Sequence, residues 1–287
     1  MGLIAVTGAT GAVGGRVAAR LAEAGLPRRL IVRDAARGPR DAGAQIRQAS
    51  AYGAGDEMRA ALEGVDTLLL IPASEALDRV AQHVCAVDAA IAAGVRHIVY
   101  LSFFRAAPDA TFTFARDHFA TERHIRDAGV PWTFLRMNLY LDFLPAMVGR
   151  DGYIRGPAGD GRVAAILRDD VAGALIAVLT TDGHERRSYD LTGRESFTLA
   201  EAAATMADAT GKRIRFHDET DEEAFDSRAD LGADEWEVRG WVSSYHAIRD
   251  GTLAPVRPDV GELTGRKPGT LAEHLAAHPE CLAHVAA

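Results

Sequence analysis

The sequence predicts an α/β protein, with a doubly wound parallel sheet followed by a smaller, mostly helical C-terminal domain. Three observations support this prediction. Short apolar runs alternate with runs of helical periodicity through the first half of the chain, which is typical of βαβ units. A glycine-rich turn joins the first apolar run to the first helical run. Beyond residue 198 the alternation gives way to mostly helical patterns.

The individual elements follow from periodicity and from glycine stops. We expect sheet strands at 3–6, 30–32, 44–49, 65–71, 95–102, 132–136 and 188–191. We expect helices at 16–25, 56–62, 75–93, 115–127 and 168–179, and a C-terminal part with helices at 198–209, 218–223 and 232–250 and a strand at 213–217. Asp56 is the expected N-cap of its helix, and Gly64 its stop.

The domain boundaries follow from these elements. Residues 1–150 are expected to form a dinucleotide-binding Rossmann domain, which residues 167–192 complete. Residues 193–287 are expected to form the smaller domain, a cap over the strand ends that supplies the substrate side. Ligands of such sheets bind beyond the carboxyl ends of the strands, so the residues at those ends are the candidates for function.

The glycine-rich turn has the spacing Gly-x-x-Gly-x-x-Gly, with Gly8, Gly11 and Gly14 between a buried strand and a helix N-terminus. A dinucleotide pyrophosphate needs a close backbone approach, free N–H donors and the positive end of a helix dipole. Gly8 permits the tight turn, Gly11 removes a side chain where phosphate would lie, and Gly14 lets helix and strand pack closely. The turn therefore predicts a dinucleotide site.

The composition and charge of the chain argue against some classes of binding partner. The formal net charge is −8 and no basic stripe is present, which argues against nucleic acid as a partner. No run of 18 apolar residues and no signal peptide is recognised, so we expect a cytoplasmic protein with a small-molecule substrate and no membrane partner; a homodimer stays open. Cys85 and Cys281 match no metal spacing, and no metal site is predicted.

An ordered set of segments resembles the NmrA-like atypical short-chain dehydrogenases, and within them the bacterial NAD(P)H:quinone oxidoreductases. The segments are Thr7-Gly8-Ala9-Thr10-Gly11, Ile31-Val32-Arg33, Leu68 to Glu75, Ala93-Gly94-Val95 before Ser102, His118 to Glu122, Leu135 to Tyr140, Gly159-Asp160-Gly161, Arg168-Asp169-Asp170 and Leu263 to Pro268. They span nearly the whole chain in the order of the family.

The resemblance implies a cofactor site. Its pyrophosphate loop would consist of Gly8, Ala9, Thr10, Gly11, Ala12 and Val13. Arg33 would hold the adenosine 2′-phosphate, so NADP(H) is expected in preference to NAD(H), while Asp34 would cap the following turn or pair with an arginine. The nicotinamide side would be flanked by Ile71, Pro72, Ala73, Ser74, Asn138 and Tyr140, with Arg168 also at the cofactor. Ser50 stands where similar sequences carry Asp near the adenine.

The catalytic pair of typical short-chain dehydrogenases, Tyr-x-x-x-Lys, is absent. None of the six tyrosines is followed four residues later by lysine, and Lys212 and Lys267 are the only lysines. The candidate catalytic residues are Tyr140, His118 and Ser102.

His118 and Ser102 each have a structural alternative. His118 and Glu122 are one helical turn apart and form either a proton donor with its orienting carboxylate or an i,i+4 structural pair. Ser102 acts in catalysis or satisfies a loop amide at a strand end.

Two functions are compatible with these residues. The first is NADPH-dependent hydride transfer to a quinone-like or other conjugated, planar acceptor, in which positioning of donor and acceptor carries most of the catalysis. The second is a non-catalytic NAD(P)-binding redox sensor of the NmrA type. The resemblance to the quinone reductases favours the enzyme.

Overall fold

The computed structural model describes residues 2–39 and 43–286. By their contacts, the residues group into two compact units, which are treated separately below. The first unit consists of Met1–Pro108, Asp117–Met137 and Asp169–Asp190, and the second of Asp109–Arg116, Asn138–Arg168 and Leu191–Ala287.

Within the described residues, a seven-stranded sheet forms the centre of the first unit, in the order β3-β2-β1-β4-β5-β6-β9. Its strands are β1 (Ile4–Val6), β2 (Arg28–Val32), β3 (Ala44–Gln48), β4 (Thr67–Leu70), β5 (His97–Phe103), β6 (Trp132–Met137) and β9 (Arg187–Leu191). The pairs β3–β2, β2–β1, β1–β4, β4–β5 and β5–β6 are all parallel. The predicted doubly wound parallel sheet is therefore confirmed.

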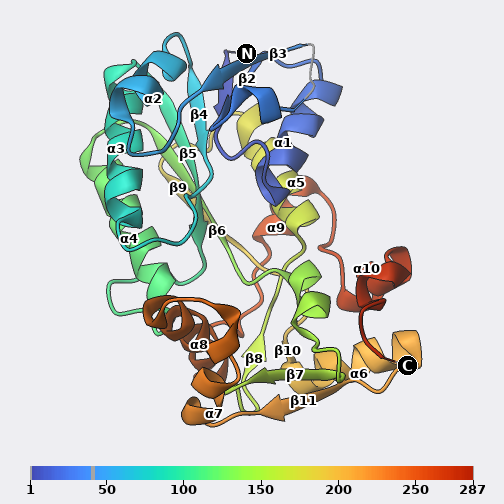
Figure 1. The fold of residues 1–287 in the computed structure, drawn as a ribbon. Coiled ribbons are helices and arrows are strands. Elements are labelled where there is room, and N and C mark those ends of the chain that lie inside the picture. The colour runs from blue at the N-terminus through green and yellow to red at the C-terminus, as the bar shows by residue number, and fades with distance from the viewer. Residues whose placement is uncertain (1, 40–42, 287) are drawn as a thin grey trace. The chain divides into compact units, whose positions relative to one another are not determined.

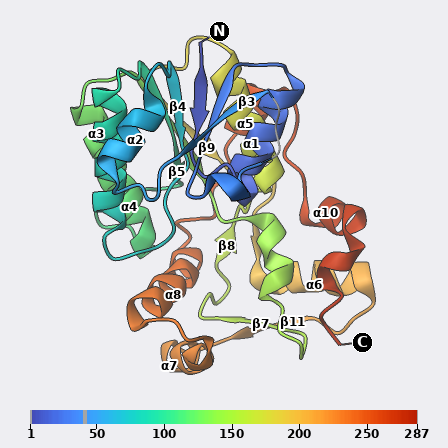
Figure 2. The same cartoon turned by 45° about the horizontal axis from the view of Figure 1, so that its top comes forward.

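Helices cover both faces of this sheet. They are α1 (Ala12–Glu23), α2 (Gly55–Leu62), α3 (Arg79–Ala92), α4 (Thr113–Asp127) and α5 (Arg168–Thr180), with the short 3-10 helix η1 (Ala35–Arg37) after β2. Figure 1 shows α1 and α5 on one face and α2, α3 and α4 on the other, and the turned view in Figure 2 agrees. Side chains on both faces of the sheet are fully buried, as shown by the adjacent residues Leu68 and Leu69 of β4, which point to opposite faces.

The strand order places a topological switch point in this sheet. From β1 the chain builds outward to β2 and β3, and then returns to place β4 on the other side of β1. The register pairs Val6 with both Leu30 and Leu69, so β1 and β4 end side by side. Ligands of open parallel sheets bind at such a point. The loops that leave β1 and β4 are the glycine-rich turn and the segment that begins at Ile71.

The second unit combines helices with two small sheets. Strand β7 (Tyr153–Gly156) pairs in parallel with β11 (Arg215–Asp218), and β8 (Arg162–Val163) pairs antiparallel with β10 (Phe197–Thr198). The helical segments are η2 (Leu141–Met147), α6 (Leu199–Thr210), α7 (Asp221–Asp226), η3 (Ala229–Leu231), α8 (Glu235–Arg249), α9 (Asp259–Thr264), α10 (Leu271–Ala277) and η4 (Pro279–Leu282). Thr198 caps α6 in a reciprocal capping box with Glu201.

Several expected boundaries differ from the structure. The N-cap of α2 is Ala54 rather than Asp56, which lies in the first turn of that helix. Helix α3 begins at Arg79, not near residue 75, because the chain after β4 is held by side-chain hydrogen bonds described below. Asp218 ends β11 instead of beginning a helix. The strands β7, β8 and β10 were not expected, since each is only two to four residues long.

The division of the chain also differs from the expected boundaries at 150 and 193. Residues 138–150 group with the second unit, because Asn138 and the residues that follow it bond there. The amide Nδ2 of Asn138 donates to the carbonyl of Leu253 at 3.0 Å, and the Leu141 amide donates to the Ile166 carbonyl at 2.8 Å. The chain thus leaves the sheet at Met137.

Candidate functional site

The glycine-rich turn takes the conformation that its sequence predicts. Gly8 adopts φ +60°, a left-handed conformation that favours glycine, and its carbonyl accepts from the Gly11 amide at 2.9 Å. A Cβ atom on Gly14 would lie 2.3 Å from the Gly8 carbonyl oxygen, so α1 packs against the turn at a distance that only glycine allows. Thr10, Gly11 and Ala12 are exposed.

The turn leads directly into the N-terminus of α1, whose N-cap residue is Gly11 and therefore offers no side chain to the first-turn amides. Such amides and the helix dipole favour an anion. The close backbone packing at Gly14 and the exposed apex of the turn leave this helix end open. These residues therefore fit the pyrophosphate of a dinucleotide.

The two residues that follow β2 differ in their surroundings, because Asp34 bonds the next turn and Arg33 is exposed. Asp34 is the N-cap of η1, and its Oδ1 atom accepts from the Ala36 amide at 2.9 Å. The carboxylate is thus engaged by the following turn, which is one of the two roles expected for it. Arg33 is exposed. Ser50, at the end of the next strand, donates its backbone amide to the exposed carboxylate of Glu57 at 2.7 Å.

The segment after β4 is bonded to four side chains that the sequence analysis did not single out. Thr7 and Tyr52 bond the backbone of Ile71, and Arg79 and His83 bond the backbone of Ala73. Two signals could have revealed them. Thr7 precedes the glycine turn, and the i,i+4 spacing of residues 79 and 83 places both on one face of α3.

Ser102 and Glu122 form a buried polar cluster in the first unit. The Ser102 hydroxyl donates to Oε1 of Glu122 at 2.6 Å. Arg136 donates to both carboxylate oxygens, at 2.8 and 2.6 Å, and Arg126 donates to Oε2 at 2.9 Å. Glu122 is fully buried. Its two oxygens accept four hydrogen bonds, and these link α4 to β5 and β6.

His118 has a different partner. Its Nδ1 atom lies 2.9 Å from the hydroxyl of Tyr100, and its ring packs near Phe103. Burial lowers the pKa of His118 well below 6.5, with Arg79 as a further cause, so the imidazole is neutral near pH 7. Burial also raises the pKa of Tyr100. Near pH 7 the His118 imidazole can therefore hold a hydrogen-bond partner in a fixed direction, but it carries no positive charge.

In the second unit, Tyr140 and Arg168 form one cluster. The Arg168 guanidinium lies 4.3 Å from the centre of the Tyr140 ring, within cation–π range. Asp142 holds the arginine through an ion pair of 3.1 Å and accepts its backbone amide at 3.3 Å. Burial raises the pKa of Tyr140, so the phenol stays protonated near neutral pH. Phe143, next to this cluster, is 52% exposed.

The expected site residues therefore fall into two groups. The first unit holds the loop residues Gly8 to Val13, Arg33, the segment Ile71–Ser74, Ser102 and His118. The second unit holds Asn138, Tyr140 and Arg168. The side chain of Asn138 is fully buried and uses both ends of its amide, since Oδ1 accepts from the Leu139 amide at 2.8 Å while Nδ2 bonds Leu253.

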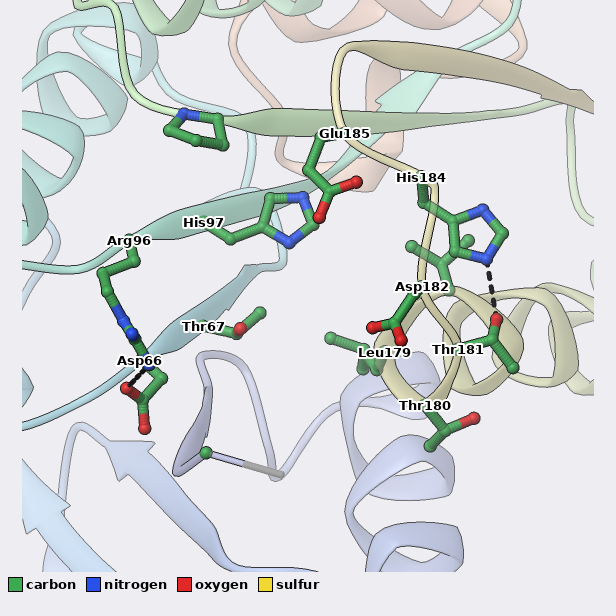
Figure 3. Close-up of a pocket in the computed structure, with 13 residues that line it drawn as sticks. Asp66, Thr67, Arg96, His97, Leu179, Thr180, Thr181, Asp182, His184 and Glu185 are labelled. Carbon is green, nitrogen blue, oxygen red and sulfur yellow. Dashed lines mark hydrogen bonds and ion pairs between the residues drawn. The ribbon is translucent and has the colours of Figure 1, made fainter.

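A pocket of about 480 Å³ lies at the other end of the sheet, where β4 and β5 begin (Figure 3). Asp66 and Arg96 form an ion pair on one side of it. On the other side, His184 bonds Thr181 at 2.7 Å. These contacts lie at the amino ends of the strands. None of the residues expected at the cofactor lines this pocket. The pocket is separate from the dinucleotide site.

Residues 2–39 and 43–286 contain neither a metal-binding cluster nor a membrane-spanning helix. In this part, three or more His, Cys, Asp or Glu side chains nowhere gather in a group that could bind a metal. No helix in these ranges is long and apolar enough to cross a membrane.

The chain is similar to known proteins over most of its length. The model of the NmrA-like family matches residues 1–232. The chain is 37% identical to (4-alkanoyl-5-oxo-2,5-dihydrofuran-3-yl)methyl phosphate reductase of Streptomyces griseus, over 98% of this chain and 99% of that protein.

Two solved structures are also similar over nearly the whole chain. The NADPH complex of the quinone oxidoreductase QOR2 from Escherichia coli has a TM-score of 0.88 and 32% identity, covering 96% of this chain and 99% of that one. The NADP(H) complex of triphenylmethane reductase from Citrobacter sp. has a TM-score of 0.86 and 31% identity, covering 96% and 99%. The chain therefore belongs to the NmrA-like family, in a group whose relatives are oxidoreductases.

Proposed function

We propose that this chain transfers hydride from NADPH to a quinone-like or other conjugated, planar acceptor. The observation that carries the proposal combines two features. The N-terminus of α1 has no capping side chain and packs closely on the glycine turn. Arg33 is exposed, while its neighbour Asp34 is already engaged as a helix cap. An acidic residue free to bond the ribose would select NAD, whereas an arginine offers a fork of donors to a 2′-phosphate.

In this proposal the glycine-rich turn holds the pyrophosphate and Arg33 the 2′-phosphate. The segment Ile71–Ser74 of the first unit is proposed to contact the nicotinamide side, and in the second unit Tyr140 and Arg168 are the candidates for that role. The Asn138 side chain is fully buried and bonded at both ends of its amide, so it serves to hold the backbone there. When bound, the nicotinamide supplies the hydride. The acceptor class follows from what the chain lacks, because no Tyr-x-x-x-Lys pair is available to protonate a simple carbonyl. A quinone or another conjugated acceptor delocalises the incoming charge and takes its proton from water or a weak acid.

The residues of the chain contribute positioning rather than strong acid catalysis. Tyr140 is a protonated phenol beside a fixed guanidinium, and His118 is a neutral imidazole bonded to Tyr100. Neither is a strong acid near pH 7. Phe143 offers an exposed aromatic face beside the Tyr140–Arg168 cluster, suited to a planar apolar molecule.

The test is NADPH oxidation by the purified protein with a panel of acceptors. The panel contains a simple quinone, an azo dye, a triphenylmethane dye and an alkanoyl butenolide phosphate, the last suggested by the name of the relative that is 37% identical. We expect turnover with at least the quinone. Tight NADPH binding with no turnover across the panel would instead support the redox-sensor function. NADH turnover faster than NADPH turnover would contradict the cofactor assignment.

A further inference from the structure

The backbone of Ile71, the first residue after β4, is held at both of its polar groups. Its amide donates to Oγ1 of Thr7 at 2.9 Å, and its carbonyl accepts from the hydroxyl of Tyr52 at 2.6 Å. Burial raises the pKa of Tyr52 to about 12, so this phenol remains a donor throughout the neutral range. The residue also lies against the glycine turn, since a Cβ on Gly8 would lie 3.2 Å from the Ile71 Cβ.

The backbone of Ala73, two residues later, is held in the same way from α3. Its amide donates to Nε2 of His83 at 2.9 Å, and its carbonyl accepts from Nε of Arg79 at 3.0 Å. Because Nε2 accepts, the proton of the neutral ring is on Nδ1, which lies 2.9 Å from Oγ1 of Thr121. Burial, with Arg79 as a second cause, lowers the pKa of His83 to about 3, so the ring stays an acceptor near pH 7.

Tyr52 connects two regions of the first unit that are distant in sequence. It lies three residues after Ala49, on the connection between β3 and α2, and its ring packs edge-on against His83 with centroids 6.2 Å apart. Its hydroxyl reaches the segment after β4. The proposed adenosine side of the cofactor and the proposed nicotinamide side are thus joined through one side chain.

We infer that Tyr52 and His83 are positioning residues, which fix the Ile71–Ala73 backbone so that the nicotinamide end of the cofactor is held in place. This inference rests on the proposed function of that segment. Thr7 and Arg79 supply the other two side-chain hydrogen bonds to this segment, so each of the four backbone groups has a side-chain partner. A hydride donor gains most from such fixation, because displacement by about 1 Å costs much of the rate.

The first test is Tyr52→Phe, which removes only the hydroxyl. Its matched control is Tyr189→Phe, which removes a phenol bonded to His184 at 2.7 Å in the same unit. The affinities for NADPH and for adenosine 2′,5′-bisphosphate, which has no nicotinamide, are measured by titration. We expect Tyr52→Phe to weaken NADPH about five- to tenfold and the bisphosphate less than twofold. Tyr189→Phe leaves both affinities unchanged.

A second variant keeps the inference testable if Tyr52→Phe folds poorly. His83→Gln offers an amide oxygen to the Ala73 amide and retains most of the affinity, whereas His83→Leu removes the acceptor and weakens NADPH as Tyr52→Phe does. With an accepted substrate, kcat falls in Tyr52→Phe and His83→Leu while the acceptor KM stays within twofold. Equal weakening of NADPH and the bisphosphate, or no weakening of either, overturns the inference. The NADPH and bisphosphate titrations need no acceptor. A failure of the proposed activity is therefore distinguished from a failure of this inference.

Discussion

Arg136 grips the buried carboxylate of Glu122 at both oxygens, from Nε to Oε1 at 2.8 Å and from NH2 to Oε2 at 2.6 Å. This bidentate pair joins α4 to β6, and Ser102 adds a bond from β5. The hydrogen bonds that Arg136 donates to Glu122 raise the pKa of Arg136. Removal of one partner from such a buried pair is destabilising, because the remaining buried charge is left uncompensated.

We therefore expect Glu122→Ala to lower the free energy of unfolding by about 3 kcal/mol, since it leaves Arg136 and Arg126 without their shared anion. The control is Glu235→Ala, which removes an exposed i,i+4 pair with Arg239 of the same spacing as Glu122–Arg126. The control is expected to change the free energy by less than about 0.5 kcal/mol. The free energies of unfolding of both variants are measured in urea. Equal losses in the two variants would contradict the structural role of Glu122.

Acid is expected to destabilise the protein before its carboxylates titrate. Burial lowers the pKa of His83 to about 3 and that of His118 well below 6.5, whereas both imidazoles bind protons near pH 6.5 when unfolded. The unfolded chain then holds more protons below pH 6.5, so stability falls as pH falls. Each imidazole contributes at most about 1.4 kcal/mol per pH unit, between the unfolded pKa and the folded one.

The measurement is urea unfolding at pH 7.0, 6.0 and 5.0. His83→Gln is expected to have a shallower decline than wild type, because one of the two buried imidazoles is gone. His217→Gln serves as the control, since His217 is exposed on β11. An unchanged decline in His83→Gln would show that this ring does not govern the acid response.

The sequence was sufficient to predict the elements whose signals are local. The glycine turn and the buried strand at Leu68–Leu70 follow from residues adjacent in the chain. For Asp34 two roles were left open, and the structure shows that it is a cap. The start of α3 was predicted four residues too early. Helical periodicity continues back through 75–78, but Tyr52 and His83 hold the preceding backbone in another conformation. These two bonds join residues 10 and 19 positions apart, and no local pattern encodes them.

The same limit applies to the candidate catalytic residues. Spacing alone paired His118 with Glu122, but it could not reveal that Tyr100 bonds the imidazole while Ser102, Arg126 and Arg136 bond the carboxylate. Tyr100 and Ser102 come from β5 and Arg136 from β6, so only the folded sheet brings them to α4, whereas Arg126 lies one helical turn from Glu122 on α4 itself. Whether His118 and Ser102 take part in the reaction stays a prediction.

The turn itself can be tested at two neighbouring glycines. A Cβ on Gly14 would lie 2.3 Å from the backbone oxygen of Gly8, whereas a Cβ on Gly15 would lie 3.4 Å from that of Ala9. We expect Gly14→Ala to destabilise the protein by about 2 kcal/mol or more and to weaken NADPH binding. Gly15→Ala, inside α1, is expected to be neutral or stabilising by up to about 1 kcal/mol. Thermal unfolding and NADPH titration of both variants provide the comparison, and equal loss in the two would contradict the close packing at Gly14.

Tyr140→Phe tests whether the phenol acts as a general acid. If positioning carries the catalysis, this variant lowers kcat by less than about tenfold, because general acids contribute about 10²- to 10⁴-fold. Tyr153→Phe is the matched control, a tyrosine of the second unit that also has an arginine, Arg155, over its ring. Steady-state rates with the accepted quinone are compared at pH 6 to 9. A loss above a hundredfold in Tyr140→Phe alone would assign it the role of proton donor.

Cofactor preference depends on Arg33. Its guanidinium is exposed at the end of β2, while Asp34 bonds the Ala36 amide and is withdrawn from competition for the ribose. A charge-assisted bond to a 2′-phosphate contributes about 1.5–3 kcal/mol, on the order of ten- to a hundredfold in affinity. We expect Arg33→Ala to lose that factor for NADPH and to keep its NADH affinity, whereas Arg123→Ala, an exposed arginine on α4, changes neither. Both dissociation constants are measured by fluorescence titration for the three proteins. Tighter binding of NADH than NADPH by the wild type would mean that the cap at Asp34 opens and that its carboxylate, not Arg33, contacts the ribose.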